Sequence, residues 1–121
     1  MEDFTELKVW QESRKFRNNI RELVRTFPDS EKFMLISQII RSSRSVTANI
    51  AEGYGRYHYQ ECIQFLRIGR GSLKETRDHL TVALDENYID QNTYKTLLEQ
   101  YFSCNRLINA YINYLKTQKK K

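Results

Sequence analysis

Residues that interrupt regular secondary structure are scarce in this chain of 121 residues, which contains 1 proline and 4 glycines. Turns depend heavily on both residue types. So few of them leave little room for the many turns of a β-sandwich or β-barrel. Because this length corresponds to one domain, we expect a single all-α domain over residues 1–115 and a basic tail over residues 116–121.

Signals for secretion and membrane insertion are also missing. Residues 1–6 are acidic and lack the apolar stretch of a signal peptide. No segment approaches the roughly 18 apolar residues of a membrane-spanning helix. The 2 cysteines, Cys62 and Cys104, suit a reducing compartment better than a disulfide scaffold. We therefore expect a cytoplasmic protein that does not contact a membrane.

Side chains that catalyse reactions or bind metals are few. The 2 histidines, His58 and His79, are far apart in the sequence, and the cysteines form no C-x-x-C pair. The Glu-x-x-His pairs of di-iron helical bundles do not occur. We therefore expect no enzymatic activity, no cofactor and no metal site.

What the sequence does contain is a regular spacing of apolar residues. Residues 5–27, 30–52, 59–86 and 90–115 place apolar or small side chains alternately three and four residues apart, which is typical of helices that bury one face. Within residues 30–52 this row includes Phe33, Ile36 and Ile40, flanked by Ile39 and Val46. Four such segments with short connections predict an up-down-up-down antiparallel four-helix bundle.

The expected helix ends carry recognisable residues. Pro28 ends the first helix, because the residue before a proline is disfavoured in a helix. Asp29 or Ser30 is a candidate N-cap for the second helix, and Gly53 is a candidate C′ glycine at its end. Asp90 is a candidate N-cap for the fourth helix.

A second apolar row in residues 90–115 points to assembly. It consists of Leu97, Tyr101, Cys104, Ile108, Tyr111 and Leu115. Such a row indicates either a wide core face or an interface between copies of the chain. We favour a homo-oligomer in which Leu97, Tyr101 and Tyr111 contact a second copy.

The second connection is rich in tyrosine. Tyr54, Tyr57 and Tyr59 are interleaved with Arg56 and His58. Such a set either stacks on nucleic-acid bases or anchors a protein interface, and we favour the interface.

Two glycines fall inside the third predicted helix. Gly69 and Gly71 lack the preceding strand that a dinucleotide-binding glycine motif requires. We interpret both as a point where two helices cross closely, the alternative being a close approach of the backbone to a ligand.

Basic residues are the most informative polar residues. The net charge is +5, of which residues 116–121 supply 4 positive charges, so these residues are either a solvated tail or a basic arm. The remaining candidates lie mostly in rows at helical spacing: Arg14, Arg17, Arg21, Arg25, Arg41, Arg44, Arg56, Arg67, Arg70, Lys74 and Arg77. Such rows either bind phosphates or form a solvated face with internal ion pairs.

Several motifs resemble a known family. Residues 4–11 read FTELKVWQ, residues 49–56 read NIAEGYGR, and residues 71–75 read GSLKE. These stretches resemble the bacterial four helix bundle protein family, whose members include proteins encoded in intervening sequences of large-subunit ribosomal RNA genes. The resemblance implies an antiparallel four-helix bundle that assembles as a homopentamer and has no enzymatic activity. Its motif residues here are Asn49, Glu52, Gly53, Gly55, Arg56, Gly71, Ser72 and Glu75, for which it implies structural positions at a helix corner and in the third helix.

The resemblance also bears on function. A distantly related group of retroelement accessory proteins binds nucleic acid through a basic surface, although residues 78–115 of this chain are net acidic. We expect a non-enzymatic homo-oligomer that binds RNA or DNA. The alternative is a scaffold whose partner is another protein.

Overall fold

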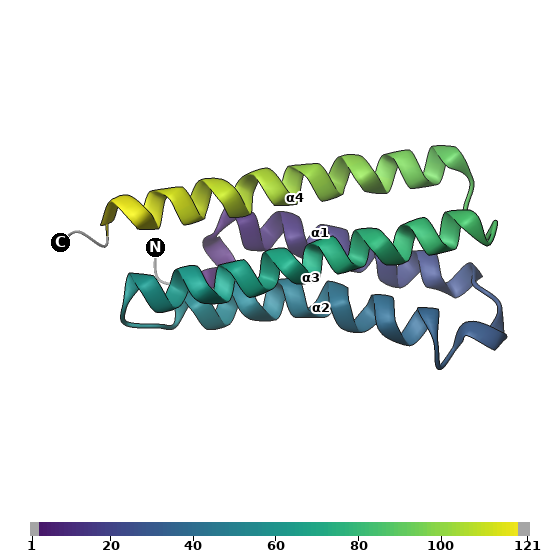
Figure 1. Cartoon of the computed structure of the whole chain (residues 1–121), viewed down its shortest axis with the longest axis horizontal. Helices are drawn as coiled ribbons and strands as arrows, with labels where there is room; N and C mark the ends of the chain where they lie inside the picture. Colours follow the sequence, from purple (N-terminus) through teal and green to yellow (C-terminus); the bar gives the residue numbers. More distant parts are fainter. Residues whose placement is uncertain (1–2, 119–121) are drawn as a thin grey trace.

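The computed structural model describes residues 3–118, which form four long helices and three short 3-10 turns. The long helices are α1 (Lys8–Leu23), α2 (Leu35–Tyr54), α3 (Tyr59–Asp85) and α4 (Gln91–Gln118). The 3-10 turns are η1 (Phe4–Glu6), η2 (Val24–Thr26) and η3 (Asp29–Glu31). Successive helices run antiparallel along one long axis (Figure 1). This confirms the predicted four-helix bundle.

Each helix packs against two neighbours. The packed pairs are α1–α2, α2–α3, α3–α4 and α1–α4. The outer face between α1 and α2 is therefore opposite the outer face between α3 and α4. Large side chains such as Phe16, Ile20, Leu66 and Ile108 are almost fully buried along the central axis.

The second helix begins later than predicted. The chain forms η3 over Asp29–Glu31 and enters α2 only at Leu35. Its N-cap is Met34, so the assignment to Asp29 or Ser30 is wrong, and Glu31 Oε1 accepts a hydrogen bond from the Leu35 backbone nitrogen at 3.3 Å. The predicted core position of Phe33 is therefore wrong, and its side chain is 85% exposed.

The buried face of α2 is centred differently from the prediction in its first half. Ile39 and Val46, expected to flank the core, are 0% and 1% exposed. Ile36 and Ile40, expected in the central row, are only half-buried. The predicted core row is therefore wrong in the first half of α2, whereas Ser43, Thr47 and Ile50 further along the helix are buried as the spacing predicts.

At the other helix ends, one predicted capping residue is confirmed and one is wrong. Asp90 Oδ1 accepts a hydrogen bond from the Thr93 backbone nitrogen at 2.7 Å, which confirms the N-cap and lowers the pKa of Asp90. Gly53 lies inside α2 instead of after it, so its C′ assignment is wrong. Lys116 belongs to α4, which corrects the predicted start of the tail, and residues 119–121 are outside the described residues.

The α2–α3 contact is close because small and hydroxyl residues line it. A Cβ added at Gly69 would lie 3.3 Å from the Asn49 Cβ, so this glycine marks a crossing point as predicted. A buried hydrogen bond of 2.8 Å joins the hydroxyls of Ser42 and Thr76 across the same contact. Gly71 has no atom within 4 Å of such a Cβ, so its predicted role in the crossing is wrong.

Candidate functional site

Three of the candidate arginines are neutralised by carboxylates. Arg25 pairs with Glu22 at 3.2 Å, and Arg56 pairs with Glu52 at 2.9 Å. Arg41 of α2 pairs with Glu75 of α3. These three fit the alternative of a solvated face with internal ion pairs, and they carry little net positive charge for a ligand.

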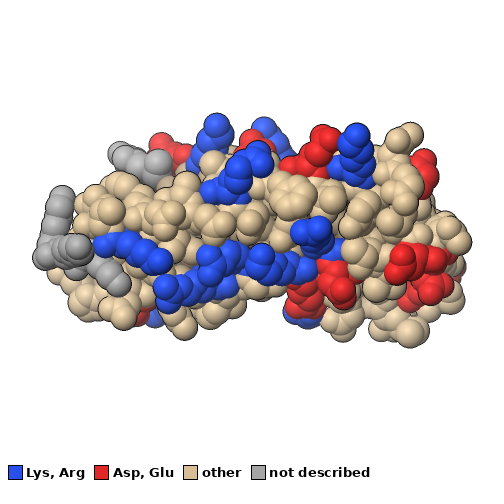
Figure 2. Space-filling model, turned by 45° about the horizontal axis from the view of Figure 1, so that its top comes forward, with Lys and Arg blue, Asp and Glu red and all other residues tan. Residues whose placement is uncertain are grey.

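Four other basic residues form a row on α3 beside α4, which we call the α3–α4 row. Its members are Arg67, Arg70, Lys74 and Arg77. Their spacing of three and four residues places them on one side of the helix. Within residues 3–118, no carboxylate forms an ion pair with any of them. Figure 2 shows basic side chains running lengthwise along one face, with a group of acidic side chains beyond the end of the row.

Neutral groups of α4 hold half of this row in place. Arg70 donates a hydrogen bond of 2.8 Å to Asn109 Oδ1. The Arg77 guanidinium carbon lies 5.1 Å from the ring centroids of both Tyr101 and Phe102, at cation–π distance. Because these partners are uncharged, the two arginines are positioned while keeping their full charge.

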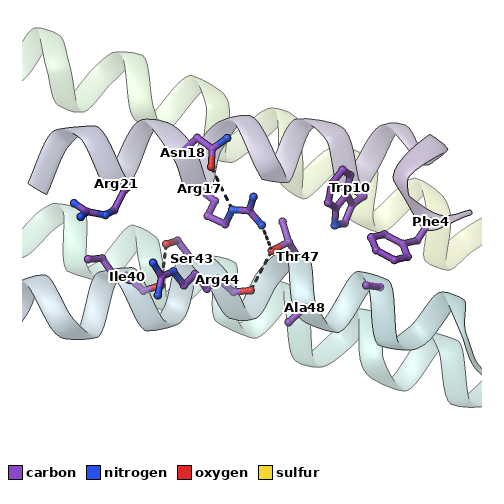
Figure 3. A pocket seen from close by; sticks show the side chains of 11 residues that line it. Phe4, Trp10, Arg17, Asn18, Arg21, Ile40, Ser43, Arg44, Thr47 and Ala48 are labelled. Atoms are coloured by element: carbon purple, nitrogen blue, oxygen red, sulfur yellow. Dashed lines mark hydrogen bonds between the residues drawn. The ribbon is translucent and has the colours of Figure 1, made fainter.

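A groove between α1 and α2 holds a second basic group (Figure 3). The groove has a volume of about 550 Å³. Arg17 and Arg21 enter it from α1, and Arg44 enters it from α2. The other lining residues are Phe4, Trp10, Asn18, Ile40, Ser43, Thr47, Ala48 and Ala51, so no described lining residue is acidic.

Arg17 occupies the middle of this groove. Its Nη1 donates to Thr47 Oγ1 at 3.0 Å, and its Nε donates to Asn18 Oδ1 at 3.4 Å. Partial burial lowers the pKa of Arg17, and the positive charges of Arg14 and Arg44 lower that pKa further. The groove is thus a place where positive charges are held close together.

Arg14 does not line the groove, although it contacts Trp10. Its guanidinium carbon is 5.6 Å from the Trp10 ring centroid. It also lines a separate hollow with Thr5, Gln11, Lys15 and Asn18, apart from the cluster of Arg17, Arg21 and Arg44.

The residues expected at an interface between copies lie in different environments. Leu97 and Tyr101 are 5% and 2% exposed within the single chain, so their predicted place at an interface is wrong. The second apolar row of the fourth helix is part of the core. Tyr111 is half-buried, and burial together with Cys62 raises the pKa of its hydroxyl.

The tyrosines of the second connection do not form one cluster. Tyr54 packs against the core, whereas Tyr57 is 91% exposed and Tyr59 is 44% exposed. Arg56 turns toward Phe65, with its guanidinium carbon 4.7 Å from that ring centroid. The exposed pair Tyr57 and Tyr59 is still available to a partner.

The motif residues at the helix corner pack or pair within the chain. The Asn49 amide donates to the Ser45 carbonyl at 2.8 Å, and Ser45 in turn accepts from the Ser72 hydroxyl at 2.9 Å. Gly53 approaches α3 so closely that an added Cβ would lie 3.1 Å from both the Cys62 carbonyl oxygen and the Phe65 Cβ.

Two further motif residues complete this picture. Gly55 ends α2 with φ of −76°, a conformation open to any residue. Glu75 accepts from Arg41 and also lies 3.0 Å from His79 Nε2. The structure thus gives packing or pairing contacts to most of these residues, while Gly71 faces open space.

Sequence reasoning missed the aromatic part of the α1–α2 groove. Phe4 and Trp10 pack edge to face with ring centroids 5.3 Å apart and close one end of it (Figure 3). The spacing of Trp10 seven residues before Arg17 was an available signal, because residues seven apart share a helix face. The partner Thr47 could not be found this way, since it is 30 residues from Arg17.

Neither a metal site nor a membrane span was found among the described residues. Over residues 3–118, no three His, Cys, Asp or Glu side chains are grouped as metal ligands. In the same range, no helix is both long and apolar enough to cross a bilayer.

Comparison with known proteins places this bundle in a family. The family model described as 23S rRNA-intervening sequence protein matches residues 5–110. Among solved structures, a protein of unknown function from the S23 ribosomal protein family of Bacteroides thetaiotaomicron is 27% identical, with a TM-score of 0.79. That match covers 86% of this chain and 97% of the other. No functionally curated protein matches. Because the family match spans most of the bundle, the chain belongs to the 23S rRNA-intervening sequence protein family.

Proposed function

We propose that this protein is a non-enzymatic, cytoplasmic homo-oligomer that binds nucleic acid through the α3–α4 row. The observation that carries this proposal is the absence of any ion-pairing carboxylate, within residues 3–118, around Arg67, Arg70, Lys74 and Arg77. Glu75, the neighbour of Lys74 in the sequence, is already engaged by Arg41 and His79. The row therefore keeps a local positive charge that a phosphate backbone would neutralise.

The length of the row suits a nucleic-acid strand. Arg67 and Arg77 are ten residues apart, which corresponds to about 15 Å along an α-helix. At 3.4 Å per nucleotide along one strand, this length spans about four nucleotides. Arg70 and Arg77 are held by neutral partners on α4, so less side-chain entropy is lost when they bind phosphate.

Assembly would strengthen such a modest surface. Four basic residues in one copy give weak binding, whereas several linked copies bind one strand with greater overall affinity. The family resemblance implies a homopentamer, and we adopt that stoichiometry in the proposal. The description of the family refers to intervening sequences of 23S rRNA, so RNA is the first probe to test.

Equilibrium binding with charge-reversed variants tests the proposal. The variant Arg67→Glu/Lys74→Glu changes the two members of the row whose side chains form no hydrogen bond or ion pair with residues 3–118. Fluorescence anisotropy of labelled single-stranded RNA and DNA is recorded over a series of salt concentrations. We expect weaker binding of both and a salt dependence whose slope falls by about 2, one for each lost phosphate contact.

The matched control is Lys8→Glu/Lys95→Glu, which makes the same change in net charge at two exposed lysines outside the row. It should retain most of the wild-type affinity and the wild-type slope. Equal weakening of both variants would contradict a specific role of the row. Wild-type protein that binds neither RNA nor DNA at low salt would refute the proposal.

A protein partner is the second candidate function. Its support is a set of large exposed apolar side chains, including Phe33 at 85%, Met34 at 64% and Tyr57 at 91% exposure. Exposed aromatic residues of this kind are enriched in protein interfaces. Recovery of one stoichiometric protein with the purified chain, without nucleic acid, would favour this candidate.

A further inference from the structure

The α1–α2 groove concentrates positive charge where the chain itself supplies no counter-charge. Arg17, Arg21 and Arg44 all line it, and among residues 3–118 no carboxylate pairs with any of them. Two arginines outside the groove, Arg25 in η2 and Arg41 in α2, do have carboxylate partners. The groove is therefore a place where three arginines without carboxylate partners come together.

The positive charges in and beside the groove act unfavourably on one another, and a bound anion would relieve this. Arg17 is partly buried, and the charges of Arg14 and Arg44 act on it unfavourably. Its hydrogen bonds to Thr47 and Asn18 fix the guanidinium without neutralising it. Guanidinium groups held in this way bind phosphate oxygens strongly, because each contact is a charge-assisted hydrogen bond.

The rest of the groove is apolar and aromatic. Phe4 and Trp10 lie at one end, and Ile40, Ala48 and Ala51 contribute apolar surface (Figure 3). Trp10 and Arg17 are seven residues apart, about 10 Å along α1, which is a span that one extended nucleotide covers. An aromatic surface beside a phosphate site suits a nucleobase, since bases stack on tryptophan.

From these contacts we propose that the α1–α2 groove binds a nucleoside phosphate, with its phosphate on Arg17, Arg21 and Arg44 and its base against Trp10. The unit is either a free nucleotide or one nucleotide of a strand. The site is on the face opposite the α3–α4 row, and it does not depend on nucleic-acid binding by that row.

Trp10 provides a direct readout because it is the only tryptophan in the chain. Its emission, excited at the red edge of its absorption, is followed during titration with adenosine monophosphate, adenosine, inorganic phosphate or a single-stranded adenylate oligonucleotide. We expect the monophosphate to change the emission, inorganic phosphate to compete with it, and adenosine to bind much more weakly. An oligonucleotide that binds more tightly than the monophosphate identifies a strand as the source, and equal affinities identify the free nucleotide.

Two variants with equal charge loss make the test specific. Arg21→Gln/Arg44→Gln removes two groove cations that form no hydrogen bond through their side chains to residues 3–118. It should weaken monophosphate binding about 100-fold, roughly tenfold for each charge-assisted contact. Arg25→Gln/Arg41→Gln removes one cation from η2 and one from α2, both outside the groove, and it should bind like wild type.

Three results would overturn this inference. They are an emission that no phosphate compound alters, equal binding of adenosine and its monophosphate, and equal weakening by the two variants. The Arg67→Glu/Lys74→Glu variant separates this site from the proposed function. It should lose binding to the α3–α4 row and still respond to the monophosphate through Trp10.

Discussion

Alanine substitutions at Gly71 and Gly53 are expected to change the free energy of unfolding in opposite directions. In a helix interior, alanine is more favourable than glycine by about 1 kcal/mol. At Gly71 the added methyl group would meet nothing within 4 Å. The stability of Gly71→Ala should therefore rise by about 0.5–1 kcal/mol.

At Gly53 the same methyl group meets atoms that cannot move independently. The distances of 3.1 Å to the Cys62 carbonyl oxygen and to the Phe65 Cβ mean that α3 itself must shift. Overpacking of this kind costs about 1–3 kcal/mol. Gly53 lies in the last turn of α2, where the propensity gain is smaller. A net loss of about 1–2 kcal/mol follows for Gly53→Ala.

Urea unfolding followed by circular dichroism measures both changes, at one fixed protein concentration because assembly also affects stability. The two variants should differ by roughly 2 kcal/mol, with unchanged dependence on urea. A destabilised Gly71→Ala would show that another surface packs on this glycine in solution. A stabilised Gly53→Ala would refute the argument from the close approach of α2 and α3.

Two further predictions test the core. Phe33→Ala should change stability by less than about 0.5 kcal/mol because its side chain is 85% exposed, whereas Ile39→Ala should cost about 2–4 kcal/mol at a position that is 0% exposed. Similar costs in urea unfolding would contradict the late start of α2. Burial raises the pKa of the Cys104 thiol from 9.0 to about 11, so the folded chain holds this proton more tightly than the unfolded chain. The resulting stability is fully present below pH 9.0 and is lost as the pH rises to about 11. Over that range, under reducing conditions, wild type should lose about 2–3 kcal/mol more than Cys104→Ala, and parallel pH profiles would contradict the assignment.

The fold was predictable because local spacing determines it. Apolar residues three and four apart, the single proline and the Asp90 cap were sufficient to place four antiparallel helices. The start of α2 was harder, because Asp29 and Ser30 are both good caps, yet the helix begins only at Leu35, whose backbone nitrogen donates to the Glu31 side chain. Glu31 also accepts a hydrogen bond of 2.8 Å from the Tyr88 hydroxyl, 57 residues away. No local pattern contains that contact.

The spacing of the two helical glycines contained information that the prediction did not use. Gly69 and Gly71 are two residues apart, which is about 200° around an α-helix. They cannot both face the same neighbour, and the structure indeed buries Gly69 and exposes Gly71. Helix geometry alone therefore predicts that only one of the two glycines faces the neighbouring helix.

The candidate site was only partly predictable. Helical spacing located the arginine rows, but it could not show which arginines are neutralised. Arg41 meets Glu75 from another helix, 34 residues away, while Arg17 finds only neutral partners. Whether a cation is free for a ligand depends on such distant contacts, which require the folded structure.

The central claim is that the protein is a nucleic-acid-binding homo-oligomer. Light scattering on a sizing column, with absorbance recorded at the nucleic-acid and protein maxima across the peak, tests it most directly. The sample is untagged protein purified at low salt. The account predicts a mass several times that of one chain and an excess of nucleic-acid absorbance that high salt removes. A peak with the mass of a single chain and the absorbance of protein alone would contradict it.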